Sequence, residues 1–418
     1  MRNFSVCMIY LWTFVNVGRP QDIFPIIGKI YPGVLVAALS LVSYLLSNER
    51  AQQNRLSIWD CPEVKLFVAF AITMVISAPF GYYPRLSLEF LKDFILKFGL
   101  YLYLVMKLIT TRERLVGLFW TLLICGLAMG IAASLEREIE VRTHVGTTYD
   151  PNDLAMLMVT ILPLCFVQIL MPGKVLVKMA SFVSGVFILI AIVATRSRGG
   201  FIGLSVITLA GVVLRIPNVS GSKKVFLILL SCLLFVAVAG PAYWNRISTI
   251  RDYEADESGR ILVWKRSLVI AASHPILGVG PDAFMTAYGD FLEKDRFPKE
   301  LSRRTTGVRV WQTAHSAYLL VLVELGIPGL LLFLAINCRS LRNLRKISQL
   351  DLSEAGELRT LQLWSQGLTI SLIGFLTCGL FISQSYNSLI YLICALSGSI
   401  LRILTPSQVS DQTNNPNN

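Results

Sequence analysis

Long apolar stretches alternate with short polar or Pro/Gly-rich breaks along almost the whole chain of 418 residues. A helix needs about 20 apolar residues to cross the hydrocarbon core of a bilayer, and this criterion predicts about twelve membrane helices. Their expected bounds are 4–17, 30–47, 65–80, 94–110, 115–134, 153–171, 175–195, 199–214, 224–241, 316–337, 366–383 and 387–404. The first stretch is short, but no small-residue cleavage site follows it, so we interpret it as a membrane segment rather than a signal peptide.

Composition supports a membrane protein. Hydrophobic residues make up 54% of the chain and charged residues only 15%, whereas soluble domains carry about 25% charged residues. This balance excludes a disordered chain, a coiled coil and a disulfide-stapled secreted domain. We therefore expect an all-α polytopic membrane protein.

The eight cysteines do not indicate a metal or disulfide framework. Most lie inside the apolar stretches, none forms a Cys-x-x-Cys pair, and none falls in the one long polar loop. Small apolar packing residues are the simpler interpretation. We expect no metal and no other cofactor.

The net charge of +12 raises the question of nucleic-acid binding. With the N-terminus placed in the cytoplasm, the predicted cytoplasmic segments carry nearly the whole basic surplus, and the short outer loops balance. This asymmetry is the one that orients membrane proteins. The surplus is therefore a topology signal, both termini are predicted to be cytoplasmic, and nucleic acid is not an expected partner.

The chain divides into four segments. Residues 1–241 hold spans one to nine, 242–315 form a long outer loop, 316–404 hold spans ten to twelve, and 405–418 are a polar tail that we expect to be disordered. The outer loop is rich in aromatic residues, which argues for a folded segment. Its apolar residues Ile261, Trp264, Leu268 and Ala272 follow helical spacing. We predict a partly interfacial lid with amphipathic helices near 258–273 and 281–293.

Two arginines in the break between spans seven and eight are candidates for binding a phosphate or pyrophosphate. Arg196 and Arg198 precede Gly199 and Gly200, which open the next helix. Free amides and the helix dipole favour an anion there, and arginine binds phosphate oxygens in pairs. The alternative is that both side chains simply reach lipid headgroups.

Two further basic residues belong to the same predicted face. Arg260 begins the first lid helix, where it is either a surface charge or a third anion-binding arginine. His315 lies directly before span ten. With an ordinary pKa near 6.5, an imidazole there can act as a general base or as an interfacial hydrogen-bonding group.

The remaining polar candidates point to structure rather than chemistry. Glu324 lies inside span ten, about 13 Å deeper than His315, and needs a buried arginine or a hydroxyl as its partner. His274, before Pro275, is interpreted as part of a defined turn, and His144 is assigned no role. The acidic residues of 252–257 could hold a divalent cation, but we favour the interpretation as a solvated charge run.

A series of motifs follows the seventh predicted span. They are Arg-Ser-Arg-Gly-Gly at 196–200, Arg260 with Trp264, His274-Pro275, Gly278-Val279-Gly280-Pro281, Ala314-His315-Ser316-Ala317-Tyr318 and Glu324-Leu325-Gly326-Ile327-Pro328-Gly329. In their order and spacing, these motifs resemble the O-antigen ligase family of polytopic bacterial ligases and polymerases. The Gly18-Arg19-Pro20-Gln21-Asp22 stretch also resembles members found with exopolysaccharide and exosortase systems.

The resemblance implies a GT-C-like helical bundle in the bacterial inner membrane that transfers a glycan from an undecaprenyl-pyrophosphate carrier to an acceptor hydroxyl on the periplasmic side, without a metal. It implies that Arg196 or Arg198 together with Arg260 hold the pyrophosphate and that His315 takes the acceptor proton or positions the reacting groups. Tyr318 and Glu324 would support the site. Family members often have asparagine where this chain has Ser316, so substrate positioning there is expected to differ.

The implied chemistry agrees with elementary electrostatics. Arginines fixed before the reaction stabilise the charge on a departing pyrophosphate, and a base opposite the leaving group predicts inversion at the sugar carbon. The expected partners are the lipid-linked donor, a glycan, lipid or protein acceptor, and membrane lipids. A repeat-unit polymerase would use the same chemistry with another acceptor. A polysaccharide transporter would instead require ionisable groups near the midplane, where Glu324 is almost alone.

Overall fold

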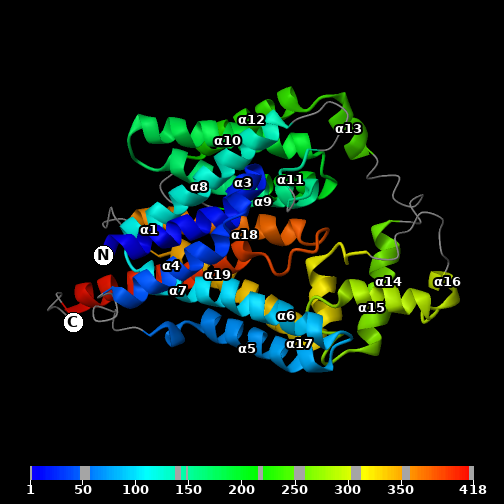
Figure 1. Ribbon diagram of the computed structural model, residues 1–418. Coiled ribbons are helices and arrows are strands. Elements are labelled where there is room, and N and C mark those ends of the chain that lie inside the picture. The colour runs from blue at the N-terminus through cyan, green and yellow to red at the C-terminus, as the bar shows by residue number, and fades with distance from the viewer. Residues whose placement is uncertain are drawn as a thin grey trace.

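The apolar stretches of the sequence are helical over most of their length in the computed structural model (Figure 1). The structure describes residues 2–47, 57–136, 143–146, 149–214, 220–248, 259–302, 312–350 and 358–413. Within these ranges there is no β-strand, only an isolated bridge between Val145 and Tyr149. The expectation of an all-α protein is confirmed.

The helices of the first half lead from the N-terminus to the turn after α10. Their bounds are α1 (Arg2–Thr13), η1 (Phe14–Gly18), α2 (Pro20–Ile23), α3 (Pro25–Gly28), α4 (Pro32–Leu46), η3 (Ile58–Asp60), α5 (Pro62–Ser77), η4 (Ala78–Phe80), α6 (Pro84–Phe94), η5 (Ile95–Gly99), α7 (Leu100–Leu108), α8 (Arg112–Leu135), α9 (Pro151–Leu170) and α10 (Val175–Thr195).

The second half contains the lid and the last membrane helices. The bounds are α11 (Arg198–Val213), α12 (Gly221–Val238), α13 (Pro241–Ser248), α14 (Arg260–Ser273), α15 (Phe284–Glu293), α16 (Lys299–Ser302), α17 (Ala317–Ser348), α18 (Leu358–Cys378) and α19 (Ser388–Thr413).

Local sequence explains where several of these helices begin. Proline occupies the first position of α4, α5, α6 and α9, where its missing N–H is not needed and its fixed φ suits a helix. Asp150, Ser197 and Ser316 cap α9, α11 and α17 with side-chain oxygens. Ser197 and Ser316 lie at the breaks that carry Arg196, Arg198 and His315, so these two residues start helices beside candidate site residues.

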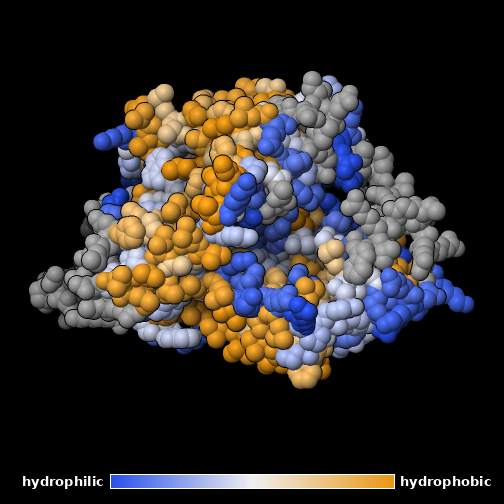
Figure 2. Space-filling model, viewed as in Figure 1, coloured by the Kyte–Doolittle hydropathy of each residue, from blue (hydrophilic) through white to orange (hydrophobic). Residues whose placement is uncertain are grey.

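Seven of the described helices are long and apolar enough to cross a membrane: α5 with η4, α8, α9, α10, α12, α17 and α18. Four shorter apolar helices accompany them: Phe4–Gly18, Pro32–Leu46, Arg198–Val213 and Ser388–Leu404. Large apolar side chains are exposed on the outer faces of α4, α10 and α12, and Figure 2 shows the resulting hydrophobic surface along the bundle. The protein is a multi-pass membrane protein.

The bundle is packed unevenly. α9 packs against α10 and α18 and is mostly buried, and α18 is buried over almost its whole apolar length. α12 lies at the edge, with very little of its surface buried. A rigid centre and a loosely covered edge therefore lie on opposite sides of α11, which contacts α9, α18 and α12.

The lid lies at one end of the bundle, opposite the beginning of α1 and the end of α19 (Figure 1). α14 and α15 share a small hydrophobic core with the start of α17, and its lid residues include Val263, Ile270, Phe284, Tyr288 and Phe291. The folded lid that the aromatic content predicts is therefore present in the described part of the loop.

Some sequence expectations differ from the structure in detail. α14 matches the predicted 258–273, whereas α15 starts at Phe284 rather than at 281. The apolar stripe of α14 lies on the outside of the lid, because Ile261 and Leu268 are exposed and Val263 and Ile270 are buried. α19 continues to Thr413, past the predicted end at 404, so the beginning of the tail is helical. The acidic residues of 252–257 lie outside the described residues.

Candidate active site

The turn between α10 and α11, residues 195–198, is called the arginine turn below. Arg196 has a left-handed backbone conformation with φ of 47°, which reverses the chain after α10. Ser197 then caps α11, since its Oγ accepts from the Gly200 amide at 3.1 Å. Both arginines are half-buried and flank this cap. Arg196 thus ends α10, and Arg198 is the first residue of α11.

Close packing fixes the beginning of α11. A Cβ atom on Gly200 would lie 2.6 Å from the Cβ of Ala155, and one on Gly203 would lie 2.4 Å from the Sγ of Cys378. Only glycine allows α11 to approach α9 and α18 this closely. The arginine turn therefore rests on the rigid centre of the bundle.

The N-terminus of α9 is attached to the arginine turn. Asp150 caps α9 through its Oδ1, which accepts from the amides of Asn152 and Asp153 at 2.6 and 2.9 Å. The Ser197 hydroxyl donates to the Oδ1 of Asn152 at 2.9 Å. Sequence reasoning did not select Asp150 or Asn152, although an Asp-Pro-Asn sequence before an apolar run is a recognisable helix start.

The first turn of the lid helix α14 contacts His315 and the segment after α18. Arg260 is its first residue. One turn later, the Trp264 indole N–H donates to the backbone oxygen of His315 at 3.3 Å, and its ring lies 6.2 Å from that of Phe381 in the segment after α18. These contacts hold the start of α14 beside His315. Trp264 was noted only as part of the apolar stripe and of a motif.

His315 lies directly before α17, in a left-handed conformation with φ of 48°. The next residue, Ser316, caps α17, and the Ala317 amide donates to the backbone oxygen of Gly379 at 2.8 Å. The Nδ1 of His315 lies 3.4 Å from the Thr313 hydroxyl. The imidazole is therefore held at the junction of the lid, α17 and the segment after α18.

Electrostatics favours a neutral imidazole at this position. Partial burial lowers the pKa of His315 below its usual value, and the positive charge of Arg260 lowers it further, while the negative charge of Asp150 acts in the opposite direction. Arg260 and Asp150 are thus both within electrostatic reach of His315. A neutral imidazole at neutral pH can accept a proton.

Glu324 is buried, with 2% of its surface exposed. Its Oε1 accepts from the Phe284 amide at 3.2 Å and its Oε2 from the Tyr386 hydroxyl at 2.8 Å. The sequence predicted an arginine or a hydroxyl as its partner, and it is a hydroxyl. Because Phe284 begins α15, Glu324 attaches the lid to α17.

Backbone contacts strengthen this attachment. The amides of Val279 and Gly280 donate to the backbone oxygens of Val323 and Glu324 at 2.9 and 3.0 Å. Gly326, with φ of 67°, interrupts the helical conformation of α17 there, and a Cβ on it would lie 2.5 Å from the Ile276 oxygen. Two of the glycine-rich motifs seen in the sequence therefore pack directly on each other.

Tyr318 and His274 also have structural partners. The Tyr318 hydroxyl donates to the backbone oxygen of Leu376 at 2.9 Å and so connects α17 to α18. The His274 ring lies 5.6 Å from the ring of Tyr82, and its Nδ1 lies 3.0 Å from the Ser273 hydroxyl. His274 is part of the turn that joins the lid helices, in line with its interpretation from sequence.

A cavity of about 500 Å³ extends along the loosely covered side of α11. Its lining is almost entirely apolar and comes mainly from α9, α11 and α12. Phe201, one turn after Arg198, and Trp244 of α13 line it, with ring centres 6.4 Å apart, and Lys224 lines it at the start of α12. The cavity therefore begins within one helical turn of the arginine turn and extends along α11 to Val212.

A comparison with known protein families matches the middle of the chain. Residues 183–334 match the family model described as O-antigen ligase. The matched segment is less than half of the chain, and it is similar to this family. It runs from α10 through the arginine turn, the cavity and the lid into α17, and thus contains every predicted site residue. Members of the family are membrane glycosyltransferase-like enzymes. No match was found among curated proteins.

Proposed function

We propose that the protein transfers a glycan from an undecaprenyl-pyrophosphate carrier to an acceptor hydroxyl at the periplasmic face of the bacterial inner membrane. The observation that carries this proposal is the position of the arginine turn. The turn starts α11, the helix that lines the apolar cavity, and Ser197 of the turn is hydrogen-bonded to Asn152 at the start of α9. Asp150, which caps α9, and Arg260 of the lid are both within electrostatic reach of His315. A lipid-linked diphosphate needs this combination of an apolar channel and fixed cations.

The donor would bind with its two chemically different parts in two environments. Arg196, Arg198 and Arg260 would hold the pyrophosphate, since guanidinium groups match pairs of phosphate oxygens. The polyprenyl chain would lie in the cavity beside α11 and α12. No water-filled route is needed, because the chain stays in an apolar environment from the membrane to the site.

The reaction exchanges one bond to the sugar carbon for another. The acceptor hydroxyl attacks the anomeric carbon, the bond from that carbon to the pyrophosphate oxygen breaks, and undecaprenyl pyrophosphate leaves with the electron pair. The hydroxyl proton goes to the Nε2 of His315, whose Nδ1 is beside Thr313. The arginines stabilise the charge that develops on the leaving group. Attack from the side opposite the leaving group inverts the sugar carbon.

We also propose the finer topology: twelve spans in a GT-C-like bundle, with both termini in the cytoplasm. The segments would be membrane helices 1–241, a periplasmic lid 242–315, membrane helices 316–404 and a cytoplasmic tail 405–418. The distribution of lysine and arginine supports this orientation, as does the location of the lid at the end of the bundle opposite the start of α1 (Figure 1).

The experiment is replacement of His315 by alanine, with Lys265→Ala as the control. Lys265 is an exposed residue of α14, the helix whose Trp264 contacts His315. Loss of a general base lowers a rate about 10²–10⁴-fold, and we expect this loss for His315→Ala and none for Lys265→Ala. Glycan transfer from the lipid carrier is the measurement. Full activity of His315→Ala refutes the assignment.

The acceptor decides between ligase and polymerase, which share this chemistry. A deletion strain that accumulates lipid-linked polymer indicates a ligase, because assembly then continues without transfer. A strain that accumulates lipid-linked single repeat units indicates a polymerase of the same family.

A further inference from the structure

A second polar cluster lies in the N-terminal segment, outside the family segment and outside the site described above. The Nε of Arg19 lies 2.7 Å from the Oδ2 of Asp22, with side-chain exposures of 29% and 7%. Arg19 itself has a left-handed backbone with φ of 43°. Burying a carboxylate costs desolvation energy that a simple turn does not require. The residues around the Arg19–Asp22 pair indicate which part of the chain the pair holds in place.

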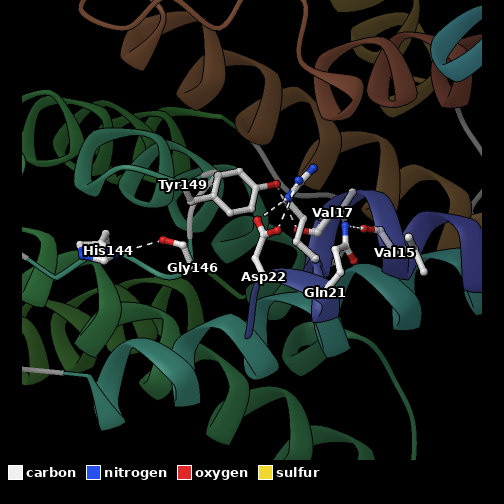
Figure 3. Close-up of polar contacts among 8 residues, drawn as sticks. Val15, Val17, Gln21, Asp22, His144, Gly146 and Tyr149 are labelled. Carbon is white, nitrogen blue, oxygen red and sulfur yellow. Dashed lines mark hydrogen bonds and ion pairs between the residues drawn. The ribbon is translucent and has the colours of Figure 1, made fainter. Parts of the chain in front are cut away.

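Residues 17–22 contact the loop between α8 and α9 at two points (Figure 3). Gly146, with φ of 63°, approaches Asp22 so closely that a Cβ on it would lie 2.4 Å from the Asp22 Cβ. The Tyr149 hydroxyl donates to the backbone oxygen of Val17 at 3.1 Å. Asp22 and Tyr149 lie side by side in Figure 3. Both contacts depend on the conformation that the Arg19–Asp22 pair gives to residues 17–22.

The same loop is hydrogen-bonded to the arginine turn and to the residue before it. The Thr143 amide donates to the backbone oxygen of Ala194 at 3.3 Å, two residues before Arg196. At the other end of the loop, Asn152 accepts from the Ser197 hydroxyl, between the two arginines of the turn. An antiparallel bridge between Val145 and Tyr149 joins the two arms of the loop. A continuous set of contacts therefore connects Asp22 to both flanks of the arginine turn.

We propose that Arg19 and Asp22 are positioning residues for the donor, and that they set the geometry of the arginine turn through residues 143–152. The proposal rests on the function proposed above, because it assigns the pyrophosphate to that turn. An error of about 1 Å in a group that orients the substrate costs up to about 10²-fold in rate. A buried ion pair that fixes the supporting loop would prevent such a displacement of the arginine turn.

The test compares Asp22→Asn with Glu89→Gln. Glu89 forms an equally simple carboxylate–arginine pair with Arg85 at 3.2 Å, but that pair is exposed, at 93% and 60%. Asp22→Asn keeps the shape of the side chain and removes the charge. We expect the KM for the lipid-pyrophosphate donor to rise about tenfold, with kcat changed about twofold or less and the KM for the acceptor unchanged. Glu89→Gln is expected to leave all three constants unchanged.

Two further variants separate positioning from general destabilisation. Tyr149→Phe removes only the hydroxyl that reaches Val17, and we expect a rise of about threefold in donor KM. Arg19→Lys retains the charge and is expected to stay closer to the wild type than Arg19→Gln. A loss of folded protein alone would lower the amount of active enzyme and leave the donor KM unchanged.

The outcomes distinguish this inference from the proposed function. If the Arg196→Ala/Arg198→Ala double variant raises the donor KM while Asp22→Asn and Tyr149→Phe behave like Glu89→Gln, the positioning role is wrong and the proposed function stands. If the double variant leaves the donor KM unchanged, the proposed function fails and the positioning role falls with it. A donor-specific rise in KM for Asp22→Asn and Tyr149→Phe supports the inference.

Discussion

The lid uses arginine in two different ways, at its edge and in its core. In the core, Arg266 of α14 is 1% exposed. Its Nε and Nη2 donate to the Leu301 backbone oxygen, its Nη1 donates to the Tyr288 hydroxyl, and its guanidinium lies 5.4 Å from the ring centre of Phe297. At the edge, Arg260 begins the same helix, is half-buried, and lowers the pKa of His315.

The difference shows what makes an arginine structural. Arg266 is surrounded by a carbonyl oxygen, a hydroxyl and two aromatic rings, so its charge is stabilised without any ligand. Arg260 instead acts electrostatically on His315, directly before α17. Arg266 fixes α14 in the lid, and Arg260 is the first residue of the same helix.

The largest expected effect is a loss of glycan transfer on replacement of Arg260, at the edge of the lid. Arg260→Ala removes a cation from the proposed pyrophosphate site, and we expect glycan transfer to fall about 10²–10³-fold, as for loss of one preorganised transition-state contact. The melting temperature should be close to that of the wild type. Lys265→Ala, which removes an exposed cation from the same helix, is the control and is expected to remain active. Equal activity of the two variants would show that Arg260 has no greater role in the reaction than an exposed surface lysine.

The second effect belongs to the core. Arg266→Met leaves the Leu301 oxygen and the Tyr288 hydroxyl without their donor, so we expect the lid to lose about 2–3 kcal/mol of stability. Hydrogen exchange of α14 and α15 should therefore speed up, with smaller changes in α9 and α18. The measurement is exchange mass spectrometry on the intact protein. Unchanged exchange in the lid would show that Arg266 does not stabilise its core.

The smallest effect concerns pH. A nearby cation disfavours the imidazolium form, so removing the Arg260 charge raises the pKa of His315, whereas removing the Asp150 charge lowers it. If His315 acts as a neutral base, activity falls as the pH drops through this pKa. The acidic limb of the pH profile should therefore move to higher pH in Arg260→Gln and to lower pH in Asp150→Asn, and should not move in Arg266→Met. The profile of the residual activity is the measurement, and shifts of the opposite sign would exclude this coupling.

Much of the fold follows from the sequence because burial in a bilayer imposes a simple length rule. The apolar stretches, the lid and both of its main helices were predictable, as was a hydroxyl as one of two partners for Glu324. The face of α14 was not, since Trp264 and Ile261 share a stripe in the sequence while only Trp264 reaches His315. Which side of a short lid helix is buried depends on contacts from α15, which hydropathy does not describe.

The sequence selects residues for the candidate site by type, and the structure adds the residues that support them. The two arginines, Arg260 and His315 stood out because charge is rare in this chain. Asp150 and Asn152 did not, because a helix cap looks the same whether it serves only its own helix or also holds a neighbouring turn. The connection from Asp22 to the arginine turn joins parts of the chain that are far apart in sequence, and such long-range contacts leave no local pattern.

The most direct measurement compares the binding of undecaprenyl pyrophosphate and undecaprenyl monophosphate, which share the same lipid chain. In nanodiscs, the wild type should bind the diphosphate at least about tenfold more tightly, because each added phosphate oxygen can pair with arginine. The Arg196→Ala/Arg198→Ala/Arg260→Ala variant should bind both lipids equally weakly. If this variant retains the preference for the diphosphate, the arginines do not form the pyrophosphate site and the account is wrong.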